Sequence, residues 1–162
     1  TFHLPRLRVT QEQVELEKRI RQMSQEERAQ QPFGFDRIWP FGLVCDLIAR
    51  YEQQDAHPRH AVESHIIRLG DVVFATNPFE LFVEYGMRIR CQSRALQTFL
   101  VQLADGSNNA FYLPTQRALD GGHYSALIKS IWVGPEGGAI LVQETVRAIQ
   151  ALFEDETYEE TR

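Results

Sequence analysis

The chain has 162 residues, of which 43% are hydrophobic and 24% charged, and its formal net charge is −5. That length allows one domain with a sizeable core, and the acidic balance without a basic stripe argues against nucleic acid as a partner. The longest apolar runs, such as Ala139–Val142, are far shorter than the roughly 20 residues of a membrane-spanning helix, so we expect no transmembrane segment.

The first quarter of the chain predicts an extended segment followed by a surface helix. Pro5 lies among the apolar residues of 2–9, a pattern that favours an edge strand. The helix is expected to begin at Thr10, because Thr10 and Gln13 have the spacing of a capping box. The few apolar positions that follow indicate that only a narrow face of this helix is buried.

The middle of the chain predicts a second helix and then a β-hairpin. Apolar residues at helical spacing predict a more buried helix over about 36–53. The apolar runs 66–69 and 72–75 are separated by Gly70-Asp71, which has the length and composition of a two-residue hairpin turn. A hairpin at this point means that the sheet cannot be all parallel.

The second half of the chain alternates helices and strands. The segment 77–80 has Asn at the N-cap position, Pro in the first turn and Glu at the third position, so a helix is expected to begin there. Strands are expected at 96–103 and 110–113, and a closing helix after 134–136. Together these elements predict an α/β fold, a mixed β-sheet with helices packed on it.

Three ordered motifs extend over about half of the chain. The first is 69–74 followed by Pro78-Phe79-Glu80, the second is Tyr112-Leu113-Pro114-Thr115, and the third is Tyr124 followed by Gly134-Pro135 and an apolar helix. In this order and at this spacing they resemble the neutral/alkaline, non-lysosomal ceramidase family.

The resemblance implies a zinc-dependent amidohydrolase whose catalytic α/β domain cleaves N-acylsphingosine-like amides. It implies Glu80 and Tyr112 as two ligands of a Zn²⁺ ion. The family's two histidine ligands and its catalytic serine belong to an N-terminal half that we match to no residue of this sequence. We therefore expect residues 1–162, which begin with Thr1, to be the C-terminal part of such a domain. The implied partners are that N-terminal half, in the same or a separate chain, and an N-acyl amide substrate.

Zinc suits amide hydrolysis because it lowers the pKa of its bound water to about 7 and polarises the carbonyl. Two oxygen ligands leave such a site incomplete, so we expect the chain by itself to be inactive. Two departures from the family leave the substrate open. Phe79 stands where the family commonly has Gly, and the run 116–122 replaces an acidic, tyrosine-rich segment.

Each candidate site residue also has an ordinary structural explanation. Glu80 completes a capping box with Asn77 whether or not a metal binds. Tyr112 fits a strand residue that packs or hydrogen-bonds at a sheet face. His123 and Tyr124 are candidates for substrate binding, because the glycines at 121–122 would let the backbone approach a ligand closely.

The remaining polar candidates are interpreted as surface residues. His57 and His60 lie in a polar, proline-containing loop without a third metal ligand. Arg88 and Arg90 fit a solvated helix face. The sequence has neither a Gly-x-Ser-x-Gly elbow nor a phosphate loop, which argues against a serine hydrolase and an NTPase.

A second function stays open, that of a non-catalytic α/β binding or interaction domain with the family's fold. Its basis is the lack of a complete catalytic constellation within the 162 residues. The two hypotheses differ in the surface that they predict. A large exposed apolar face would favour a missing partner half, whereas a wholly polar surface would favour a self-sufficient binding domain.

Overall fold

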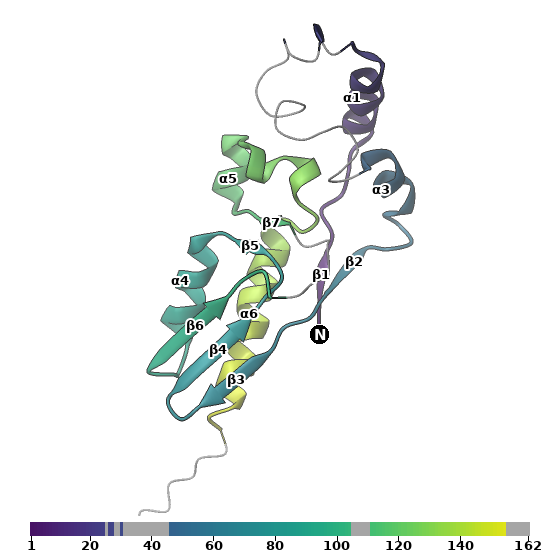
Figure 1. The fold of residues 1–162 in the computed structure, drawn as a ribbon. Coiled ribbons are helices and arrows are strands. Elements are labelled where there is room, and N and C mark those ends of the chain that lie inside the picture. Colours follow the sequence, from purple (N-terminus) through teal and green to yellow (C-terminus); the bar gives the residue numbers. More distant parts are fainter. Residues whose placement is uncertain (25, 28–29, 31–45, 105–110, 155–162) are drawn as a thin grey trace, which may run out of the picture.

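The computed structural model describes residues 1–24, 26–27, 30, 46–104 and 111–154 (Figure 1). The elements in chain order are β1 (Phe2–Pro5), α1 (Gln11–Gln22), α3 (Leu47–Gln53), β2 (Arg59–Val62), β3 (Ile66–Leu69), β4 (Val72–Thr76), β5 (Glu80–Leu81), α4 (Val83–Gln92), β6 (Gln97–Val101), β7 (Tyr112–Leu113), α5 (Gln116–Gly121), the 3₁₀ turns η1 (Tyr124–Ala126) and η2 (Ile128–Ser130), and α6 (Pro135–Ala151). Within the described residues the strands form three small sheets.

The largest of these sheets has the strand order β3-β4-β6. Strands β3 and β4 form the predicted antiparallel hairpin, and Gly70 adopts a φ of +61° at its turn, where a side chain would be strained. Strand β6 then runs parallel to β4, and α4 forms the connection between them. The predicted α/β fold with a mixed sheet is confirmed.

Helix α6 packs behind this sheet together with α4 (Figure 1). The ring of Tyr85, on α4, is buried against α6 at Gly138, where an added Cβ would lie 2.3 Å from the Tyr85 ring. The Tyr85 hydroxyl donates a hydrogen bond of 2.8 Å to the carbonyl oxygen of Pro114, directly after β7. One buried side chain thus connects α4, α6 and the end of β7.

The predicted start of a helix at 77–80 is wrong. The Asn77 side chain accepts a hydrogen bond from the Phe79 N–H at 3.1 Å, which makes a turn, and Glu80 lies in strand β5. Helix α4 begins only at Val83, after an N-cap residue, Phe82, that makes no side-chain cap bond. The Glu80 N–H instead donates to a carbonyl next to β7, so strand pairing between distant segments overrides the local capping pattern.

Several other predictions are confirmed. Thr10 and Gln13 form the reciprocal capping box of α1, and the N-terminal segment is a strand paired antiparallel with β2. The closing helix is α6. Of the helix expected over 36–53, the described part contains α3, while 36–45 lies outside the described residues. No helix in the described ranges is long and apolar enough to cross a bilayer.

The surface assignment of His60 is wrong. His60 lies in β2, whose alternating pattern turns it and Val62 inward. Its ring stacks on Trp132 with the centroids 6.3 Å apart and an interplanar angle of 18°. His57 is exposed, as predicted.

Candidate functional site

Glu80 and Tyr112 are register partners in the two-stranded parallel sheet of β5 and β7. The Glu80 N–H donates to the carbonyl oxygen of Phe111 at 2.9 Å, which fixes this register. Their neighbours in the chain, Phe79 and Leu113, are fully buried. Because side chains alternate along a strand, Glu80 and Tyr112 share the opposite, more accessible face.

The side chains of this pair meet. The Tyr112 hydroxyl hydrogen-bonds with Tyr124 and with the Glu80 carboxylate. Burial and these two hydrogen bonds, together with the charge of Glu80, raise the pKa of Tyr112 well above its ordinary value. At neutral pH Tyr112 is therefore a neutral phenol beside a carboxylate.

Tyr124 completes a small aromatic and polar cluster. It belongs to η1, and its ring meets that of Tyr112 edge to face, with the centroids 5.6 Å apart and an interplanar angle of 86°. Tyr124 is partly exposed, at 39%. Three segments that are far apart in the sequence, β5, β7 and η1, thus bring Glu80, Tyr112 and Tyr124 together.

The cluster lines an open hollow of about 300 Å³. The lining residues are Glu80, Leu81, Phe82, Gln102, Leu103, Tyr112, Tyr124 and Ser125. The Gln102 side-chain oxygen accepts a hydrogen bond from the Leu81 N–H at 2.9 Å and so fastens the end of β6 to β5. The hollow combines a carboxylate and hydroxyls with apolar walls, which is the usual make-up of a small-molecule site.

Backbone strain is concentrated at the edge of this hollow. Among the described residues, the non-glycine residues with positive φ are Leu103 and Phe111, at 56° and 48°. Leu103 lines the hollow, and Phe111 accepts the hydrogen bond that sets the register of Glu80. Conformations of this kind cost about 1–3 kcal/mol each and cluster at functional sites.

The other predicted site residues lie apart from the cluster. His123 is the exposed residue before η1 and does not line the hollow. Arg88 lies over the ring of Tyr85, and Arg90 donates to the carbonyl oxygen of Thr98. Sequence reasoning missed Gln102 and Ser125 as lining residues. The only signals for them in the sequence were their positions. Gln102 lies at the end of the strand predicted over 96–103, and Ser125 follows the candidate residue Tyr124.

Glu80 and Tyr112 are two oxygen donors of the kind that zinc accepts as ligands. Zinc–oxygen bonds are about 2.0–2.2 Å, so two oxygens on one ion lie within ~4.4 Å of each other. Loss of the shared proton would turn this pair into two anionic oxygens. In the part of the chain that the structure describes, however, no group of three or more His, Cys, Asp or Glu side chains could hold a metal ion.

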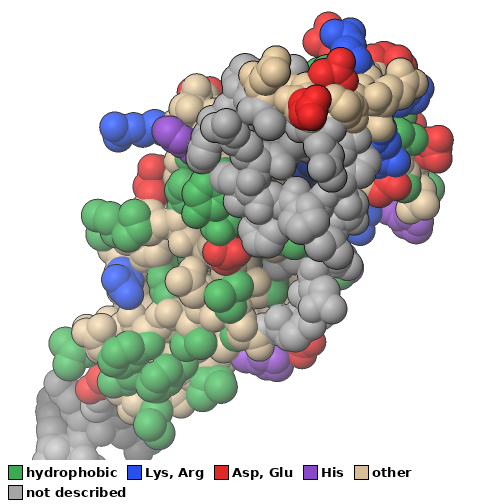
Figure 2. Space-filling model, turned by 45° about the horizontal axis from the view of Figure 1, so that its top comes forward, with side chains coloured by type: hydrophobic (Ala, Val, Ile, Leu, Met, Phe, Trp, Pro, Cys, Tyr) green, Lys and Arg blue, Asp and Glu red, His purple; other side chains and the backbone are tan. Residues whose placement is uncertain are grey.

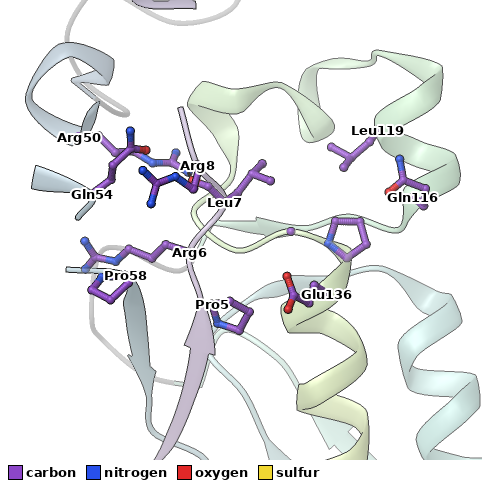
Figure 3. A pocket seen from close by; sticks show the side chains of 12 residues that line it. Pro5, Arg6, Leu7, Arg8, Arg50, Gln54, Pro58, Gln116, Leu119 and Glu136 are labelled. Carbon is purple, nitrogen blue, oxygen red and sulfur yellow. Dashed lines mark hydrogen bonds between the residues drawn. The ribbon is translucent and has the colours of Figure 1, made fainter. Parts of the chain in front are cut away.

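A larger cavity, of about 550 Å³, lies elsewhere, around the segment that follows β1. Figure 3 shows three arginines, Arg6, Arg8 and Arg50, at this cavity. Arg8 forms an ion pair with Asp55, 2.6 Å apart. The Arg6 guanidinium stacks over Trp132, 5.0 Å from the ring centroid.

Arg50 has the most defined structural role at this cavity. It donates to the carbonyl oxygens of Leu7, Ile128 and Ile131. It also lies over the Trp132 ring, 4.9 Å from the ring centroid. Since Arg50 and Arg8 are held by internal partners, we interpret this cavity as part of the packing around the N-terminal segment.

Comparison of the chain with protein-family models, with curated proteins and with solved structures finds no significant match. The function is therefore inferred from the geometry around Glu80 and Tyr112.

Proposed function

We propose that this chain supplies part of the active site of a zinc-dependent amide hydrolase. Glu80 and Tyr112 provide two oxygen ligands, and a polypeptide region beyond the described residues provides the nitrogen ligands. The observation that carries the proposal is the pairing of these two residues across β5 and β7 at an open hollow. The motif resemblance to neutral ceramidases agrees with this pair.

Glu80 does not have the helix-capping role that was its alternative explanation, and this supports the metal proposal. Glu80 lies in a strand, so its carboxylate does not cap the N-terminus of α4. Phe79, which departs from the family pattern, is fully buried and faces away from the hollow. Where the family commonly has Gly, Phe79 therefore changes the core and not the surface that is available to a substrate.

The chain's own residues suggest how such a site would work. When bound, zinc would activate a water molecule and polarise the amide carbonyl. Glu80 would hold the ion, and Tyr112 would release its proton on joining the ligand set. Leu81, Phe82 and Leu103 offer apolar walls for an acyl chain, and an N-acyl amide is the substrate class that these walls and the polar cluster favour.

The alternative function is a non-catalytic α/β interaction domain. This alternative predicts a wholly polar surface, whereas the apolar residues Leu69 and Leu96 are 72% and 85% exposed. Exposed apolar side chains on this scale favour a chain that lacks a partner layer. We therefore prefer the incomplete hydrolase.

The test uses the protein in the assembly that it forms in its native cells. The proposal predicts about one zinc ion per chain by metal analysis, and zinc-dependent cleavage of a fluorogenic N-acyl amide. Glu80→Gln should lower both, while the control Glu84→Gln, an exposed carboxylate on α4, should change neither. An assembly that holds no zinc and cleaves no N-acyl amide would refute the proposal.

A further inference from the structure

The carboxylate of Glu80 has no cationic partner within the described residues. Glu80 is half-buried, and no described residue that lines the hollow is basic. The ion pairs that the described residues form do not include Glu80 either. Its neighbour Tyr112 is a neutral phenol at neutral pH and leaves the negative charge in place. Burial of an unpaired charge is costly, and a cation bound in the hollow would reduce that cost.

Two aromatic rings form a corner of the same hollow. The rings of Tyr112 and Tyr124 meet edge to face, with the centroids 5.6 Å apart and an interplanar angle of 86°, and both residues line the hollow. The face of an aromatic ring carries partial negative charge and attracts ammonium groups. The carboxylate and the rings therefore favour the same kind of ligand group, one with a positive charge.

The other walls of the hollow are apolar. Leu81, Phe82 and Leu103 line it, and its volume of about 300 Å³ has room for a short hydrocarbon chain. Leu103 is 62% exposed and has a φ of 56°, which glycine adopts more easily than leucine. Strained residues of this kind cluster at functional sites, which favours a contact of Leu103 with a ligand.

From this lining we infer that the hollow binds a primary alkylammonium ion. The ammonium group donates to the Glu80 carboxylate and lies against the Tyr112 and Tyr124 rings, while the alkyl chain lies along the apolar walls. Such an ion needs no further protein ligand, whereas a metal ion needs more ligands than the described residues around Glu80 offer. The inference goes beyond the proposed function and does not depend on zinc.

A primary ammonium fits this lining better than a quaternary one. Its N–H groups can donate to the carboxylate of Glu80 and to the hydroxyl oxygen of Ser125, which also lines the hollow. A quaternary ammonium has no donor and would leave these oxygens without a hydrogen bond. Hydrogen bonds between an ammonium and a carboxylate are also stronger than those between neutral groups.

The test measures binding of hexylammonium to the full chain by isothermal titration calorimetry, at neutral pH and with EDTA present. The amine is protonated there, because the pKa of an alkylammonium is near that of a lysine side chain, about 10.4. Hexanol has the same alkyl chain without the charge, and hexanoate has the opposite charge. We expect hexylammonium to bind about tenfold more tightly than hexanol, because hydrogen bonds to charged groups contribute that much. Hexanoate should bind more weakly than hexanol.

Paired variants assign the binding to this hollow. Glu80→Gln keeps the shape of the side chain but removes its charge, and should lower the affinity for hexylammonium about tenfold, to that for hexanol. The control Glu84→Gln removes an exposed carboxylate on α4 and should leave the affinity unchanged. Tyr124→Leu should lower the affinity several-fold, whereas Tyr124→Phe, which retains the ring, should keep it.

The β3-β4-β6 sheet is a second place where an alkyl chain could bind. Figure 2 shows hydrophobic side chains gathered over that part of the molecule, where Phe99 is 45% exposed. Affinity that falls in Phe99→Ser and is indifferent to Glu80→Gln would place the ligand on the sheet and overturn the inference. Hexylammonium that binds no more tightly than hexanol would overturn it as well. Since EDTA removes metal ions, these results are independent of the zinc proposal.

Discussion

The ring of Tyr85 occupies the space next to Gly138 on α6. A Cβ atom at position 138 would lie 2.3 Å from Cζ of Tyr85 and 2.4 Å from its hydroxyl oxygen. The same hydroxyl donates to the carbonyl oxygen of Pro114. The approach of α4 to α6 and the position of the chain after β7 therefore depend on the same side chain.

Gly138→Ala should destabilise the protein by about 1–3 kcal/mol, because the added methyl group displaces the buried Tyr85 ring. Denaturant unfolding followed by circular dichroism measures this change. Gly121→Ala is the matched control, since its Cβ would meet only the His123 ring at an ordinary 3.8 Å. Equal stability of the two variants would contradict the close packing at Gly138.

Tyr85 should also make the protein sensitive to alkali. Burial raises the pKa of Tyr85 from 10.0 to about 12. The folded state therefore holds this proton more tightly than the unfolded state, and stability that is fully present below pH 10 is lost as the pH rises towards 12. Tyr85→Phe should flatten the fall in unfolding free energy between pH 10 and 12.

Tyr112→Phe should flatten the slope as well, because the pKa of Tyr112 is raised too, by burial and by its hydrogen bonds with Tyr124 and Glu80. An unchanged slope in Tyr85→Phe would mean that its hydroxyl titrates normally.

Glu17 on α1 is a second site of high expected sensitivity. Its carboxylate is buried and lies 2.7 Å from Nζ of Lys129 and 3.1 Å from Nε of Arg21. Removing one partner of a buried ion pair costs about 3–5 kcal/mol, so Glu17→Ala should lower the unfolding free energy by that order.

Glu15 supplies the comparison on the same helix. It pairs with Lys18 at 3.1 Å, but both side chains are about half exposed. Glu15→Ala should therefore cost less than about 1 kcal/mol. Similar losses in Glu15→Ala and Glu17→Ala would show that burial of Glu17 is unimportant.

Leu103 should tolerate loss of its side chain unusually well. Its φ of 56° is unfavourable for leucine and favourable for glycine, and 62% of the residue is exposed. Leu103→Gly should change the unfolding free energy by less than about 1 kcal/mol. Leu100→Gly, in the middle of β6, should lower it by more, and the reverse order would argue against strain at Leu103.

The parts of the fold that depend on local sequence were predictable. The Gly70-Asp71 turn between two apolar runs specifies a hairpin, and the reciprocal bonds of Thr10 and Gln13 specify the start of α1. Each signal lies within a few residues along the chain. The physical cause is therefore visible in the sequence without knowledge of distant contacts.

The parts that depend on distant contacts were not predictable in the same way. Asn77 to Glu80 has a good local capping pattern, yet Glu80 pairs with Tyr112, more than thirty residues further along. His60 looked like a loop residue, because its burial depends on Trp132 in the last third of the chain. The meeting of Glu80 with Tyr112 was expected only from the motif resemblance.

The most direct measurement is anomalous diffraction at the zinc absorption edge from crystals of the chain soaked in millimolar Zn²⁺. The account predicts an anomalous peak about 2.0–2.2 Å from both the Glu80 carboxylate and the Tyr112 hydroxyl oxygen. It also predicts that this peak is lost in Glu80→Gln crystals. No peak between these two oxygens at saturating zinc, or one that persists in Glu80→Gln, would contradict the assignment of this pair as zinc ligands.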